Sequence, residues 1–134
     1  MIDLGTAKIL KGKVGSGGRT FTIIGTPHYM APEIITGKGY GFMVDLWSVG
    51  ICLYEFMCGG VPFAEDAEDP YEIYEEIIKK PLTFPPFLKD KNAKKIMHQL
   101  LNKVADLRLG GSYAALKANA WFSNFDWVRL FPHF

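Results

Sequence analysis

The sequence has no excess of charge of either sign and very little cysteine. Fifteen lysines and arginines against fourteen aspartates and glutamates leave a net charge of +1, which gives no electrostatic argument for nucleic-acid binding. The two cysteines, Cys52 and Cys58, are too few for a disulfide framework. Because they stand in an apolar stretch, we expect buried free thiols in a reducing compartment, and therefore a cytoplasmic protein.

Long uncharged hydrophobic runs and regular metal-ligand spacings are also lacking. The most apolar stretch, residues 44–63, contains Asp45 and Glu55. A membrane span of ~20 residues tolerates such charges poorly, so we predict a buried core helix and no membrane span. The three histidines are too scattered to indicate a metal site, and the acidic run 65–69 lacks the central glycine of a calcium loop.

Apolar residues, by contrast, are abundant and follow helical patterns. They make up 49% of the sequence. The length of 134 residues corresponds to one domain. We therefore expect some apolar surface to face a partner or another part of the same fold. Residues 44–57 are almost continuously apolar, which predicts a helix buried on all sides. Gly59 and Gly60 end it.

Two further helices are marked by their first residues. Asp69 followed by Pro70 is typical of a helix start, and Asp90 can cap another helix that has apolar residues on one face between 93 and 101. A last short helix is expected near residues 112–119. Strand signals are few, so the predicted fold class is mainly α.

Several short motifs occur in a fixed order along the chain. A glycine-rich loop at residues 11–20 lies between DLG (3–5) and APE (31–33), and GTPHY (25–29), DLWSVG (45–50) and Arg108 complete the set. In order and spacing it resembles the activation segment and large lobe of a protein kinase, whose signature includes D-F-G, a phosphosite and A-P-E.

Longer stretches narrow the resemblance. RTFTIIGTPHYMAPEIITGKGY, VDLWSVGICLYEFMCGGVPF and EDPYEIYEEI are most similar to cyclic-GMP-dependent protein kinases, particularly those of single-celled eukaryotes, with cyclic-AMP-dependent kinases next. The resemblance covers essentially the whole chain and implies a mainly α, partial protein-kinase-like fold without the small lobe. Residues 1–134 would form a partial kinase domain: metal-binding motif and activation segment (1–33), helical large lobe (34–127) and the start of a truncated C-terminal tail (128–134).

The resemblance implies a Ser/Thr protein kinase under cyclic-GMP control. Such an enzyme transfers the γ-phosphoryl group of Mg-ATP to serine or threonine in substrates rich in basic residues. Asp3, which alone would be assigned to a turn or a helix cap, matches the ligand of Mg²⁺, and Gly5 is the backbone pivot beside it.

The chain carries no catalytic residue of its own. The sequence shows no glycine-rich nucleotide loop, no small-lobe lysine with its glutamate, and no catalytic loop with its base. We therefore expect the small lobe and catalytic loop to lie upstream, and the 134-residue chain alone to be inactive and to bind ATP poorly.

Thr22 matches the activation phosphosite, although Thr20 is a second candidate. A phosphate brings about two negative charges and needs cationic partners. Lys8 matches one such partner. In isolation, Thr22 would read as an ordinary loop threonine.

The same stretch implies a substrate groove. Ile23, Pro27 and Met30 match the apolar wall for the residue after the phosphoacceptor, with core packing an equal alternative for Met30. Thr26 matches a threonine that bonds to the catalytic loop. Glu55 matches the glutamate that binds a substrate arginine, and Tyr29 would orient it. His28 replaces a glutamate common in the cyclic-AMP-dependent kinases, so one negative charge of that groove is absent.

Three further residues are implied to be structural. Glu33 and Arg108 match a buried ion pair that ties the activation segment to the lower helices. Asp45 matches an aspartate that accepts hydrogen bonds from the backbone of the catalytic loop.

The alternative function is a non-catalytic, helical protein-interaction module derived from a kinase lobe. It would dock a partner in the groove around Glu55 and along the helix at 70–80. A glycine-rich loop and a catalytic loop upstream in the same reading frame favour the kinase, and a true start at Met1 favours the module. Expected partners of the kinase are basic protein substrates, the missing small lobe and regulatory cyclic-nucleotide-binding domains. Exposed lobe surface also predicts dimerisation.

Overall fold

The fold is an assembly of short helices around one longer helix. The computed structural model describes residues 27–37, 39–111 and 113–122. The elements in chain order are η1 (Pro27–Tyr29), α1 (Pro32–Ile35), α2 (Met43–Cys58), α3 (Pro70–Lys79), α4 (Lys91–Leu100), η2 (Ala105–Gly111), α5 (Tyr113–Lys117) and η3 (Ala120–Phe122). Within the described ranges there is no strand, only an isolated bridge residue at Tyr40. The predicted mainly α class is confirmed.

The sequence signals at the helix ends are confirmed. Asp69 caps α3 by accepting a hydrogen bond from the Tyr71 amide, and Asp90 caps α4 by accepting from the Asn92 and Ala93 amides. Gly59 ends α2 with φ of 87°, a left-handed conformation that favours glycine. These caps satisfy backbone groups that the helices leave unpaired, so the boundaries follow from local chemistry.

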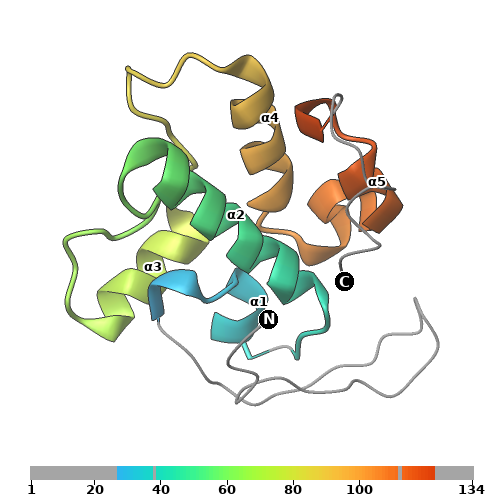
Figure 1. Cartoon of the computed structure of the whole chain (residues 1–134). Helices are drawn as coiled ribbons and strands as arrows, with labels where there is room; N and C mark the ends of the chain where they lie inside the picture. Colours follow the sequence, from blue (N-terminus) through green and yellow to red (C-terminus); the bar gives the residue numbers. More distant parts are fainter. Residues whose placement is uncertain (1–26, 38, 112, 123–134) are drawn as a thin grey trace, which may run out of the picture.

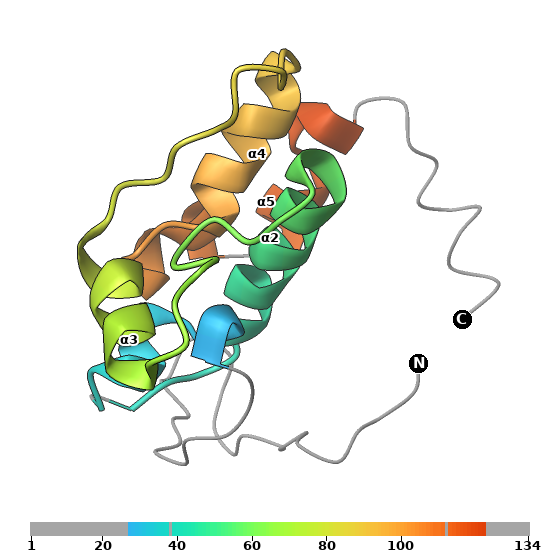
Figure 2. The same ribbon diagram turned by 90° about the vertical axis from the view of Figure 1, so that its left-hand side faces the viewer.

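Helix α2 runs through the middle of the described structure, with α3 on one side and α4 and α5 on the other (Figure 1). It contacts α4, η2 and η1. In both views the η1–α1 segment lies beside α3 (Figure 2). The main core cluster joins η1, α1, α2 and α3, with Trp47 and Ile51 of α2 fully buried at its centre.

The prediction that α2 is buried on all sides is wrong. Asp45, Val49, Cys52 and Phe56 are all exposed. Their spacing of four, three and four residues places them on one face of the helix, which we call the outer stripe of α2. Phe56 is 89% exposed. The described helices cover the opposite face only, which is why apolar composition alone overestimated the burial.

The prediction that both cysteines are buried is also wrong. Both are free, as expected, but neither is fully buried: Cys52 is exposed on the outer stripe of α2, and Cys58 is half-buried at the end of that helix. Their apolar neighbours in sequence lie on both the covered and the uncovered faces of α2. The apolar stretch around the two cysteines therefore did not predict whether their side chains are buried.

Candidate functional site

The η1 turn brings Tyr29 to the last turns of α2. The Tyr29 hydroxyl donates a hydrogen bond to Oε1 of Glu55, across 26 positions of sequence. This hydrogen bond, together with burial and the Glu55 charge, raises the pKa of Tyr29 to about 12. The phenol therefore remains a donor at neutral pH and fixes the position of the carboxylate.

Glu55 is half-buried near the C-terminal end of α2. Among the described residues, Tyr29 is the one that donates a hydrogen bond to its carboxylate. An ionised carboxylate can accept about four hydrogen bonds. Glu55 thus keeps acceptor capacity for a positively charged group, and a guanidinium matches it well because it donates from a planar fork.

Glu33 and Arg108 form a bidentate ion pair. Arg108 Nη1 donates to Glu33 Oε1 at 2.8 Å, and Nη2 donates to Oε2 at 3.2 Å. The remaining Arg108 N–H groups donate to the carbonyls of Met43 and Asn102, and the guanidinium lies 5.2 Å from the centre of the Trp47 ring. The Arg108 side chain is fully buried, and each of its five N–H donors has an acceptor.

Asp45 and Met30 are placed differently from each other. Asp45 stands in the first turn of α2 and is exposed, and its side-chain carboxylate has no hydrogen bond to any described residue. Met30 is 6% exposed and belongs to the main core cluster, which is the core-packing alternative for that residue. Pro27, at the start of η1, is half-buried.

The protein kinase domain family model matches residues 1–122. The chain belongs to the protein kinase family. It is 47% identical to a cGMP-dependent protein kinase of Eimeria tenella and 46% identical to one of Toxoplasma gondii, each over 97% of the chain. A cAMP-dependent protein kinase catalytic subunit of Dictyostelium discoideum is 41% identical over 84% of the chain.

This kinase-family chain corresponds to a small part of those relatives. The matched region is 13% of the Eimeria and Toxoplasma proteins and 17% of the Dictyostelium protein. The identities to the Eimeria and Toxoplasma proteins confirm the resemblance to cyclic-GMP-dependent kinases that the motifs implied.

Several predicted site residues of this kinase-family chain lie outside the described residues. They are Asp3, Gly5, Lys8, Thr22, Ile23 and Thr26. In the part that the structure does describe, no group of three or more His, Cys, Asp or Glu side chains is arranged to hold a metal ion. None of the helices there combines the length and hydrophobicity needed to cross a bilayer.

Two contacts made by basic residues were not expected from the sequence. The Lys103 ammonium donates to the carbonyls of Ile77 and Lys80 at the end of α3 and lies 4.9 Å from the centre of the Phe63 ring, and burial lowers its pKa. His28 contacts the Ala64 carbonyl. All three partners are backbone carbonyls distant in sequence, and a carbonyl gives no signal in the residue type.

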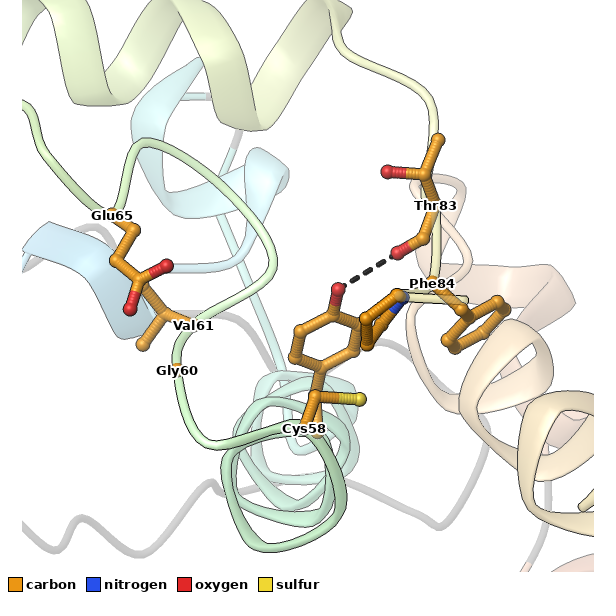
Figure 3. Close-up of a pocket in the computed structure, with 8 residues that line it drawn as sticks. Cys58, Gly60, Val61, Glu65, Thr83 and Phe84 are labelled. Carbon is orange, nitrogen blue, oxygen red and sulfur yellow. Dashed lines mark hydrogen bonds between the residues drawn. The ribbon is translucent and has the colours of Figure 1, made fainter. Parts of the chain in front are cut away.

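An open pocket of about 270 Å³ lies between the end of α2 and the segment after α3. Figure 3 shows Thr83 and Phe84 on one side and Val61 and Glu65 on the other. The Tyr54 hydroxyl donates to the Thr83 carbonyl at 2.8 Å across it. Burial raises the pKa of both Tyr54 and Cys58 in its wall, so neither is an ionised nucleophile at neutral pH.

Proposed function

We propose that this chain is the large-lobe part of a Ser/Thr protein kinase that phosphorylates substrates containing basic residues, under cyclic-GMP control. The observation that carries the substrate class is the Tyr29–Glu55 hydrogen bond, which leaves a half-buried carboxylate with free acceptor capacity beside η1. The names of the Eimeria and Toxoplasma relatives support the cyclic-GMP dependence.

Glu55 is proposed to bind an arginine of the substrate. A half-buried carboxylate is costly to desolvate unless a donor compensates it, and Tyr29 supplies one donor only. A substrate guanidinium would supply further charge-assisted hydrogen bonds, which are roughly twice as strong as neutral ones. His28 adds no negative charge here, so Glu55 carries the preference for basic substrates in the described part of the groove.

The remaining groove residues are proposed from the resemblance. Ile23, Pro27 and Met30 would line the wall for the residue that follows the phosphoacceptor. Because Met30 is buried in the core, it would support that wall from behind. Thr26 would bond to the catalytic loop.

Transfer of the phosphoryl group is proposed to require segments beyond this chain. Mg-ATP would supply the phosphoryl group, and Asp3 would be a ligand of the magnesium ion. The sequence shows no general base or nucleotide loop, and positioning with charge neutralisation supplies most of the rate in this reaction. The 134-residue chain alone is therefore expected to be inactive.

Activation is proposed to depend on phosphorylation of Thr22. Lys8 would pair with the phosphate, and Gly5 would give the neighbouring backbone its conformational freedom. Glu33 and Arg108 would anchor the end of the activation segment to the lower helices through their ion pair. The division into residues 1–33, 34–127 and 128–134 follows the same proposal.

The substrate site is tested by peptide binding to the 134-residue chain. The probe is a short peptide in which two consecutive arginines precede a serine, and binding is followed by NMR chemical-shift titration. Glu55→Gln should weaken binding roughly 10-fold or more, because a hydrogen bond between charged groups is lost.

The matched control is Glu68→Gln, which removes an exposed loop carboxylate that makes no hydrogen bond to the described residues and should leave binding unchanged. A second control peptide has both arginines replaced by alanine. Equal binding of the two peptides, or equal effects of the two substitutions, would contradict the assignment of Glu55 and favour the non-catalytic interaction module.

A further inference from the structure

The η1 turn is tied to the segment before α3 through His28. Its Nε2 atom lies 3.0 Å from the Ala64 carbonyl oxygen, in a partly buried contact between residues 36 positions apart. A carbonyl oxygen can only accept a hydrogen bond, so Nε2 must carry the proton. The imidazole therefore donates into the fold and is turned to Ala64.

Ala64 is a well-fixed acceptor. It is 6% exposed and has φ of 54°, a left-handed conformation that is uncommon for alanine. Its amide donates to Glu76 Oε2 at 2.8 Å, and its carbonyl also accepts from the Ala67 amide at 3.1 Å. Hydrogen bonds to its amide and to its carbonyl hold the Ala64 backbone in place, and Ala64 belongs to the main core cluster.

The η1 turn itself is short and depends on its neighbours. It spans three residues, and among the described residues the Met30 amide closes it by donating to the Pro27 carbonyl at 3.2 Å. An isolated 3₁₀ turn of this length is not stable alone. His28 binds it to the segment before α3, and the next residue, Tyr29, binds it to Glu55 of α2.

We propose that His28 is a positioning residue for the basic-substrate site. By donating to the Ala64 carbonyl, it fixes the η1 turn so that Tyr29 holds the Glu55 carboxylate in the orientation that accepts a substrate arginine. The proposal rests on the proposed function, in which Glu55 binds that arginine. It assigns His28 an action through Tyr29 and Glu55, with no contact to the substrate.

The test compares two substitutions of similar size. His28→Gln keeps a side-chain N–H that can reach the carbonyl, whereas His28→Leu has no donor. Both are made in the 134-residue chain, and peptide binding is measured with the two-arginine peptide and with its alanine counterpart. His28→Leu should weaken binding of the arginine peptide roughly 3- to 10-fold, the effect of losing one neutral hydrogen bond. His28→Gln should bind the arginine peptide about as tightly as the unmodified chain does. The alanine peptide should bind equally to all variants.

A double substitution separates this proposal from the proposed function. If His28 acts through Glu55, His28→Leu combined with Glu55→Gln should bind the arginine peptide no more weakly than Glu55→Gln alone. Independent, additive losses would overturn the positioning role while leaving the substrate site intact. No effect of Glu55→Gln would overturn the substrate site, and the positioning role with it.

Two measurements do not depend on peptide binding. In the unmodified chain, long-range ¹H–¹⁵N spectra should show the neutral His28 imidazole protonated at Nε2, and protonation at Nδ1 would overturn the proposal. Hydrogen exchange of the Met30 amide should be faster in His28→Leu than in His28→Gln, and equal exchange would overturn it as well.

Discussion

At the scale of single residues, Arg108 connects three separate parts of the chain. Its N–H groups bond to Glu33, to the Met43 carbonyl and to the Asn102 carbonyl. We expect Glu33→Ala to lower the free energy of unfolding by about 3 kcal/mol, because it leaves a buried guanidinium without a counter-charge. Urea denaturation measures the change, with Glu68→Ala, in the exposed loop before α3, as the matched control. Equal stabilities of the two variants would contradict this account of the ion pair.

Tyr29 gives the stability of the chain a specific dependence on alkaline pH. Its pKa is about 12 in the folded chain, against an ordinary value of 10, chiefly because the phenol donates to Glu55. A raised folded pKa contributes stability that is complete below pH 10 and is lost as the pH rises towards 12. The difference in unfolding free energy between the wild type and Tyr29→Phe should therefore be constant below pH 10 and decline above it. A difference that does not change between pH 9 and pH 12 would show that Tyr29 titrates normally.

Residue types predicted some of these contacts and not others. The kinase resemblance implied that Glu33 and Arg108 pair and that Tyr29 orients Glu55, and the structure brings both pairs together. It gave no indication of the contact between His28 and the Ala64 carbonyl. Every residue has a carbonyl, so only the fold decides which one lies within reach of a given side chain.

At the scale of elements, Gly50 sets how closely α2 approaches α4. A Cβ atom on Gly50 would lie 2.8 Å from Leu101 Cδ2 and 2.9 Å from Leu100 Cβ. Alanine is the better helix former by about 1 kcal/mol, but overpacking a core typically costs ~1–3 kcal/mol. Because Leu100 Cβ sits next to its own backbone and cannot rotate away, we expect Gly50→Ala to lower the melting temperature.

The matched control for Gly50→Ala is Val49→Ala, one residue earlier on the same helix. Val49 is 49% exposed on the outer stripe, so its truncation should change stability by no more than about 0.5 kcal/mol. Thermal unfolding of both variants decides the point. A higher melting temperature for Gly50→Ala would mean that helix propensity outweighs the contact with α4.

The helix boundaries were predictable, whereas the burial of their faces was not. Asp69 and Asp90 act as caps because their side chains reach backbone amides two or three residues away, an interaction contained in the local sequence. Which face of α2 is covered depends on elements up to several tens of residues away. The apolar run at residues 44–57 therefore predicted the helix correctly and its environment incorrectly.

At the scale of the whole molecule, the outer stripe of α2 is the main apolar surface that the described elements leave uncovered on this helix. Val49 and Phe56 are 49% and 89% exposed, and Asp45 and Cys52 lie on the same face. The chain spans 13% of its Eimeria and Toxoplasma relatives. In the proposed kinase this stripe would contact other segments of the catalytic domain, with Asp45 accepting hydrogen bonds from backbone amides.

That assignment predicts that Phe56→Ser affects stability differently in the 134-residue chain and in a longer kinase domain. In the 134-residue chain, Phe56→Ser should change the unfolding free energy by no more than about 0.5 kcal/mol, because the ring is already in water. It should also reduce self-association at high concentration, measured by sedimentation velocity, because an apolar patch is lost.

The second setting is a kinase domain that contains this chain together with its catalytic loop. If that domain buries Phe56, the same substitution should lower the free energy of unfolding by roughly 3–5 kcal/mol, as truncation of a buried phenylalanine does. Glu68→Ser, in an exposed loop, should be neutral in both settings. A neutral effect of Phe56→Ser in the longer protein would show that the stripe is an interaction surface in its own right, which favours the non-catalytic module over the kinase lobe.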